Sequence, residues 1–230
     1  MKDKKVLIVV DFDWTVFDLR ILTEAMEKAL DAFGLKPDLF KQTFEHAKDN
    51  PEGYYDRETH ISAILKAQGQ HDEGHREAIM STWKDLTRIL SASAFDPLEF
   101  QAFKTALSGI EVVILTYGEQ TFQQSKLDAS GVSALVEHTY ITSVIGGKEQ
   151  HLRSWLDEYE QVVSINDAVE PNDSFLTTFR SEVDAGRLLI LEMQREYKNS
   201  AKQRHTVVEG IVPVTDLGER TVEVILKWIR

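Results

Sequence analysis

The sequence contains no cysteine, so it can form no disulfide and offers neither a thiolate metal ligand nor a cysteine nucleophile. Long apolar runs are also missing. The apolar stretch after the charged first residues is Val6–Val10, and Asp11 and Asp13 follow it at once. Such a stretch is too short for a signal-peptide core or a membrane span. We therefore expect a cytoplasmic protein that does not act in a membrane.

Positive charge is scarce as well. The chain has 26 lysine and arginine residues against 38 aspartate and glutamate residues, which gives a formal net charge of -12 at pH 7. Proteins that bind nucleic acids concentrate positive charge to neutralise phosphates, and no run rich in lysine or arginine is present here. A nucleic-acid partner is therefore disfavoured, since it would need a local basic groove. The composition says nothing about the oligomeric state.

Short apolar runs recur along the chain, each bounded by charged or turn-forming residues. Buried parallel strands have this length and this content of β-branched residues. Segments with helical periodicity separate the runs, and one of them begins at Asp96-Pro97, with proline at the first helical position. The alternation predicts an α/β fold with a Rossmann-like parallel sheet flanked by helices. The predicted strands are Val6–Val10, Val112–Leu115, Tyr140–Ile145, Val162–Ile165 and Leu188–Leu191.

The spacing of these strands is uneven. The first ends at Val10 and the second begins near Glu111, which leaves about 70 residues more than one crossover between parallel strands needs. The excess has helical periodicity throughout. We therefore predict a core of residues 1–17 and 94–230, with an all-helical cap subdomain of residues 18–93 inserted after the first strand.

Two carboxylates, Asp11 and Asp13, stand just beyond the first strand. Ligands of open α/β sheets bind outside the carboxyl ends of the strands, and residues i and i+2 of an extended chain point the same way. A carboxylate nucleophile can split the hydrolysis of a phosphate monoester into two easier steps. That chemistry needs a cation and a second acid to protonate the leaving oxygen, so the pair is suited to it.

Further polar residues follow the later strands. The second strand leads into Thr116-Tyr117-Gly118, and a helix begins soon after, with N–H groups that could receive phosphate oxygens. Lys148 stands in the first turn of another helix, where it opposes the helix dipole and so calls for a reason. Asp167 ends a further strand, where it could bind a metal.

In this order, the four features resemble the four motifs of the haloacid dehalogenase-like superfamily. Asp11 to Thr15 resembles the first motif, Asp-x-Asp-x-Thr/Val, and Thr116 resembles the second. Lys148 resembles the third, and Asn166-Asp167 the fourth, acidic motif. The resemblance covers the whole chain, because the insertion after the first motif looks like the helical cap of this superfamily.

The resemblance implies a phosphatase with a phosphoaspartyl mechanism and Mg²⁺ as cofactor. Asp11 would attack phosphorus, and Asp13 would protonate the leaving group and then activate water. Thr116 and Lys148 would be catalytic too and, with Tyr117 and Gly118, would bind the substrate, a small phosphorylated metabolite. The metal ligands would be Asp11, Asp13 through its carbonyl, and Asp167.

Two positions depart from the family pattern. Trp14 stands where phosphatases often have glycine, and it would either contact substrate or pack against the cap. The fourth motif usually carries another acid four or five residues later, and none stands there. Glu170 or Asp173 would have to take its place if the loop bends differently.

The inserted segment carries an aromatic and basic group made by Tyr54, Tyr55, Arg57 and His60. These side chains would contact an anionic substrate or pack inside the cap.

Other functions share this framework. A phosphomutase would use every one of the catalytic residues, and a 2-haloacid dehalogenase would use Asp11 to attack carbon without magnesium or a second acid. Asp13 therefore argues against the dehalogenase. A degenerate, non-catalytic binding module is the alternative from another class, supported by Trp14 and the altered fourth motif.

Overall fold

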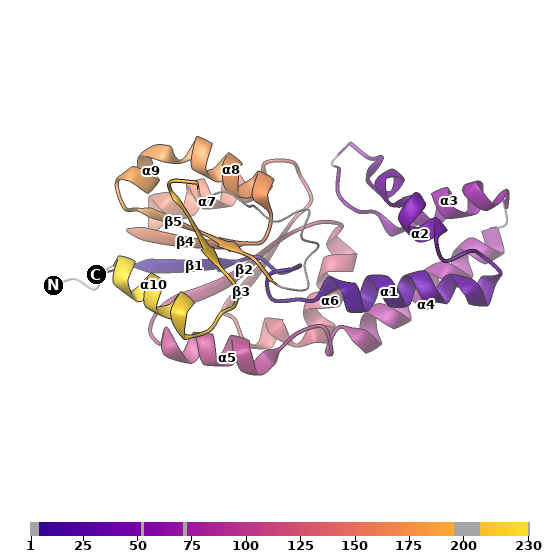
Figure 1. The fold of residues 1–230 in the computed structure, drawn as a ribbon, viewed down its shortest axis with the longest axis horizontal. Helices are drawn as coiled ribbons and strands as arrows, with labels where there is room; N and C mark the ends of the chain where they lie inside the picture. Colours follow the sequence, from indigo (N-terminus) through magenta and orange to yellow (C-terminus); the bar gives the residue numbers. More distant parts are fainter. Residues whose placement is uncertain (1–4, 52, 71–72, 196–207, 230) are drawn as a thin grey trace.

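The computed structural model describes residues 5–51, 53–70, 73–195 and 208–229. At its centre lies a parallel sheet in the order β3-β2-β1-β4-β5-β6 (Figure 1), which confirms the predicted α/β class. The strands are β1 (Val6–Val10), β2 (Glu111–Tyr117), β3 (His138–Thr142), β4 (Gln161–Asn166), β5 (Leu188–Met193) and β6 (Ile211–Val214). β1 lies in the middle, between β2 and β4, so its carboxyl end is central to the sheet edge.

Two strands differ from the prediction. β3 ends at Thr142, and the next apolar residues, Val144 and Ile145, are 44% and 70% exposed in the loop that follows. These two apolar residues are therefore not part of the buried strand that their sequence predicted. β6 was not predicted, because it is a short edge strand that contains Pro213, a residue that weakens any strand pattern.

Helices cover both faces of the sheet (Figure 1), with α5 and α10 on one face and α7, α8 and α9 on the other. None of the described helices is long and apolar enough to cross a membrane. Asp96 caps α5 by accepting hydrogen bonds from the N–H groups of Leu98 and Glu99, as the sequence predicts. The core helices are α5 (Pro97–Ala106), α6 (Gln120–Ser130), η3 (Val132–Ala134), α7 (Gly147–Glu158), α8 (Val169–Thr178), α9 (Arg180–Asp184) and α10 (Glu219–Ile229).

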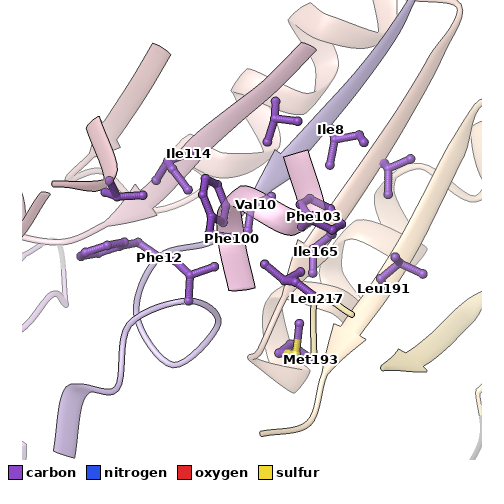
Figure 2. Close-up of a cluster of buried hydrophobic side chains, with 14 of the residues drawn as sticks. Ile8, Val10, Phe12, Phe100, Phe103, Ile114, Ile165, Leu191, Met193 and Leu217 are labelled. Atoms are coloured by element: carbon purple, nitrogen blue, oxygen red, sulfur yellow. The ribbon is translucent and has the colours of Figure 1, made fainter. Parts of the chain in front are cut away.

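Alternate residues of β1 enter two apolar cores, one on each face of the sheet. Ile8 and Val10 belong to the cluster that contains Phe103 of α5 (Figure 2). Leu7 and Val9 belong to the cluster on the opposite face. All five β1 residues are buried, and this double burial makes the strand end a rigid support for the residues that follow it.

The segment between β1 and α5 is helical and lies to one side of the sheet (Figure 1). We call its helices the helical subdomain. It has an apolar cluster of its own, in which Trp83 is fully buried, and this cluster also takes in Phe122 from α6 of the core. The helices are α1 (Leu19–Ala29), η1 (Leu30–Phe33), α2 (Leu39–Gln42), η2 (Phe44–Lys48), α3 (Arg57–Gln68) and α4 (Glu73–Leu90).

His60 is fully buried in the interior of the helical subdomain. Its Nε2 lies 2.9 Å from the Phe40 carbonyl, and its Nδ1 lies 2.9 Å from the Tyr55 hydroxyl. Because a carbonyl can only accept, Nε2 carries the proton and Nδ1 accepts from tyrosine. Burial lowers the pKa of His60 to about 4, so the imidazole ring is neutral in the folded protein at neutral pH.

We expect His60→Gln to weaken the pH dependence of folding stability, since glutamine keeps a donor and an acceptor but does not titrate. Between the folded pKa of about 4 and the ordinary value of 6.5, the unfolded chain binds a proton that the folded protein does not. The stability from His60 is therefore complete above pH 6.5 and is lost as the pH falls towards 4. Between pH 7 and pH 5 the wild type should lose about 2 kcal/mol from this residue.

Denaturant unfolding of both proteins at the two pH values measures this difference. Other groups titrate equally in both proteins, so their contribution cancels in the comparison. An identical pH dependence in the wild type and in His60→Gln would contradict the assignment.

Candidate active site

A cleft of about 1370 Å³ separates the carboxyl edge of the sheet from the helical subdomain. Its walls bring together predicted site residues from four separate places in the sequence. Gly118, which was predicted to bind substrate, is not among the residues that line it. The predicted residues that do line it are Asp11, Asp13, Thr116, Tyr117, Lys148 and Asp167.

Asp11 is held by both its main chain and its side chain. Its N–H donates to the Ile165 carbonyl at 2.8 Å, which continues the pairing of β1 with β4 by one residue. Of the side-chain oxygens, Oδ1 accepts from the Phe12 N–H at 2.7 Å, and Oδ2 lies 2.8 Å from Lys148 Nζ. The carboxylate is thus oriented at both oxygens and is 8% exposed as a residue, at the floor of the cleft.

Lys148 reaches Asp11 from the first turn of α7. This ion pair explains why a lysine is tolerated at a helix start, where the dipole opposes it. The preceding residue, Gly147, packs closely against β3, because a Cβ there would stand 1.9 Å from Thr142 Oγ1 and 2.9 Å from Thr142 Cβ. Glycine therefore lets the start of α7 approach the sheet, and this approach brings Lys148 to the cleft.

The chain turns sharply after Asp11. The N–H groups of Thr15, Val16 and Phe17 all donate to the Phe12 carbonyl, which winds the loop around one acceptor. Trp14 has a φ of 62° in this loop, in the left-handed region that glycine adopts more readily than tryptophan. The ring is half-buried on the cleft wall, where it can contact a bound ligand.

Asp13 is held by two residues of α6 that no sequence motif indicates. Lys126 Nζ lies 2.5 Å from Oδ1 and 2.6 Å from Oδ2 of Asp13. Gln123 Nε2 donates to the same Oδ2 at 2.9 Å, and also to the Tyr117 carbonyl at 2.9 Å. Each of the two carboxylates after β1 therefore has its own lysine.

Lys126 is 1% exposed, and its ammonium group lies over the rings of Phe12, Phe17 and Phe122. Burial lowers the pKa of Lys126, and the charge of Asp13 opposes this effect. A signal for this residue does exist in the sequence. Lys126 lies one helical turn after the buried Phe122, and a lysine on such an apolar face needs an acidic partner elsewhere.

Two of the N–H groups at the start of α6, which the sequence suggested for phosphate oxygens, are already occupied. The Glu119 carboxylate accepts from the N–H groups of Thr121 and Phe122, each at 2.7 Å, and so caps the helix. Burial alone would raise the pKa of Glu119, but these hydrogen bonds and the nearby Arg57 outweigh it and lower the pKa.

Asp167 follows β4 directly and is 7% exposed on the cleft wall. Of the two candidates for a second acid, Glu170 is exposed and lines the cleft, whereas Asp173 is half-buried and does not line it. Among the described residues, no three acidic or histidine side chains gather closely enough to hold a metal ion. The fifth position after Asp167, where the acidic motif that this segment resembles often has an acid, is the fully buried Asn172, which donates to the Asn166 carbonyl.

The aromatic and basic group of the helical subdomain divides between its interior and the boundary with the core. Tyr55 and His60 bond to each other in the interior. Arg57 is buried at the boundary, 3.4 Å from Glu119 and over the ring of Phe122. None of these three residues lines the cleft, so they serve packing rather than direct contact with a ligand there.

In sequence, the chain matches no family model and no curated protein. Its structure is similar to several solved structures over nearly its whole length. A proposed haloacid dehalogenase-like hydrolase from Burkholderia xenovorans has a TM-score of 0.70 at 19% identity, with 99% of each chain covered. L-2-haloacid dehalogenase from Xanthobacter autotrophicus has a TM-score of 0.62 at 13% identity, covering 96% of this chain and 98% of that one. A proposed hydrolase of the same kind from Bacillus subtilis, solved bound to magnesium, has a TM-score of 0.61 at 15% identity, covering 97% and 99%.

We expect Gly147→Ala to destabilise the protein by about 1–3 kcal/mol, because the new methyl group would overlap Thr142 and push α7 away from β3. Equilibrium unfolding in urea measures the loss. Thr142→Ala removes the atom of closest overlap, so the double variant should regain part of the stability relative to the sum of the single changes. A Gly147→Ala protein as stable as the wild type would contradict the close packing.

Proposed function

We propose that this chain, which has the fold of the haloacid dehalogenase-like hydrolases, is a hydrolase that cleaves a small phosphorylated metabolite with the help of Mg²⁺. The observation that carries the proposal is the pair of carboxylates on one cleft wall, each held by its own lysine. Asp11 with Lys148 is suited to act as a nucleophile, and Asp13 with Lys126 is suited to move a proton. A reaction of this kind needs both groups within reach of one substrate.

In the first half of the proposed reaction, an Asp11 carboxylate oxygen attacks phosphorus. The bond from phosphorus to the ester oxygen breaks, and that oxygen takes a proton from the Asp13 carboxyl group as the alcohol leaves. In the second half, water attacks the phosphorus of the phosphoaspartate and gives a proton to the Asp13 carboxylate. The bond from phosphorus to Asp11 then breaks, which releases inorganic phosphate and restores both side chains.

Thr116 and Lys148 would bind the phosphoryl group. Thr116 is the last buried residue of β2, and it lines the cleft with its neighbour Tyr117. Lys148 is a fixed positive charge beside the attacking oxygen, and a group placed in advance in this way stabilises developing negative charge. Phosphoryl transfer depends largely on such positioning and electrostatic stabilisation.

The donor set fits magnesium. Asp11 and Asp167 offer two buried carboxylates at the ends of the adjacent strands β1 and β4. Mg²⁺ commonly binds one or two carboxylates together with water and substrate phosphate, so a cluster of three acids is not required. Asp11, Asp167 and the main-chain carbonyl of Asp13 would hold the ion. When bound, it would screen the repulsion between Asp11 and the phosphate.

Two other reactions use the same fold and the same nucleophile. Dehalogenation of a 2-haloacid releases halide, which needs no proton from a second acid. That reaction therefore does not account for the lysine and glutamine that hold Asp13. A phosphomutase would use the same residues but return the phosphoryl group to a sugar phosphate. The products distinguish these reactions, since only the hydrolase releases inorganic phosphate into water.

We expect Asp11→Asn to lower phosphatase activity by at least about 10³-fold, because the amide cannot attack phosphorus. The assay is phosphate release from a panel of phosphorylated metabolites, with circular dichroism to verify that the variant is folded. Asp157→Asn, which changes an exposed acid on α7, is the matched control and should retain full activity. Full activity in Asp11→Asn would rule out the phosphoaspartyl mechanism.

Activity should also require the metal. Chelation of divalent ions is expected to abolish phosphate release, and added Mg²⁺ should restore it. Asp167→Asn should raise the Mg²⁺ concentration needed for half-maximal activity by about 10-fold or more, because one of two carboxylate ligands is lost. Halide release from 2-chloropropionate without added metal, together with no release of phosphate from any ester, would instead assign the protein to the dehalogenases.

A further inference from the structure

We infer that Lys126 and Gln123 of α6 are positioning residues that hold the Asp13 carboxylate in the direction from which it exchanges a proton with the substrate oxygen. The inference rests on the proposed function, since it assigns a purpose to the surroundings of the proposed acid. It concerns two residues that do not line the cleft and that act through Asp13.

Three hydrogen bonds fix the Asp13 carboxylate from the α6 side. Lys126 Nζ contacts both oxygens, at 2.5 and 2.6 Å, and Gln123 Nε2 contacts Oδ2 at 2.9 Å. The side chain of Asp13 is still 20% exposed, and the residue lines the cleft. The carboxylate is therefore anchored on one side and open on the other, which is the arrangement that a proton-transferring group needs.

The anchor is itself immobile. Lys126 is 1% exposed, and its ammonium group lies 4.7 to 5.7 Å from the centroids of three phenylalanine rings. In such surroundings an ammonium group is stabilised by its carboxylate and by the ring faces, with little water to replace either. Breaking the contact with Asp13 would leave the buried Lys126 ammonium group without its carboxylate partner, so the contact is strongly favoured.

Gln123 is fixed in the same way. It is 4% exposed, and its Nε2 group also donates to the Tyr117 carbonyl, at the end of β2. The next residue, Gly118, has a φ of 153°, and a Cβ there would stand 2.6 Å from Gln123 Nε2. The glycine after β2 therefore makes room for Gln123. Because Gln123 contacts both Asp13 and the Tyr117 carbonyl, the position of Asp13 is fixed relative to the end of β2 as well as to α6.

A purely structural role for these residues makes a different prediction. If Lys126 only tied α6 to the loop after β1, its loss would lower stability and slow all substrates by the same factor. If it positions the acid, its loss would slow mainly those esters whose leaving oxygen needs a proton. The dependence of rate on the leaving group therefore separates the two roles.

The test compares the wild type with Lys126→Met, in which a flexible apolar side chain of similar length fills the space among the rings. The substrates are methyl phosphate, phenyl phosphate and p-nitrophenyl phosphate, whose nitrophenolate departs without a proton. We expect kcat/KM of the variant to fall about 10²-fold or more with methyl phosphate and less than about 10-fold with p-nitrophenyl phosphate. KM should change by less than about 3-fold, since Lys126 does not touch the substrate.

Lys104→Met is the matched control, because Lys104 also pairs with a carboxylate, that of Glu137, away from the cleft. It should slow the three esters equally, if at all. Gln123→Leu should give the same selective loss as Lys126→Met, but smaller, and it decides the question if the lysine variant does not fold.

Each result has a clear consequence. Equal losses for all three esters would overturn the positioning role and leave the proposed function intact. A wild-type protein that hydrolyses none of the esters, nor any phosphorylated metabolite, would overturn the proposed function and the positioning role with it. A selective loss with poor leaving groups supports both.

Discussion

The hydrogen bond from the Asp11 N–H to the Ile165 carbonyl extends the pairing of the two central strands by one residue. Because this bond belongs to the sheet, the direction of the Asp11 side chain is set by the fold rather than by a loop. Two residues after Ile165, Asp167 reaches the same cleft. Two lysines reach the carboxylates after β1 from different helices. Lys148 comes from the start of α7, and Lys126 comes from the middle of α6. Charges placed on rigid supports need little rearrangement during a reaction.

The strands that could be predicted from the sequence are those whose burial produces a run of apolar residues. β1, β2, β4 and β5 are buried almost throughout, so their apolar runs are visible in the sequence. β6 lies at the edge of the sheet and is only partly buried, and a proline interrupts it. Val144 and Ile145 show the opposite error, because they are apolar yet exposed, and sequence patterns cannot distinguish such residues from the end of a strand.

The site could be predicted where its residues follow strands, because the ends of parallel strands meet at one edge. The structure places Asp11, Thr116 and Asp167 there. Lys126 lies six residues into a helix, and nothing in its immediate neighbours indicates which acid it meets. Its partner, Asp13, is 113 positions away, so the pairing follows from packing of α6 against the loop after β1. Local patterns do not contain that information.

Helix α6 belongs to both halves of the molecule. Its Phe122 side chain is part of the apolar cluster of the helical subdomain, and the next residue, Gln123, donates to Asp13. Arg57, at the start of α3, lies over the same Phe122 ring and pairs with Glu119 at the cap of α6. A rotation of the helical subdomain would therefore displace α6 and, with it, the side chains that hold Asp13. Under the proposed function, the direction of the Asp13 carboxylate would then depend on how the helical subdomain packs against α6.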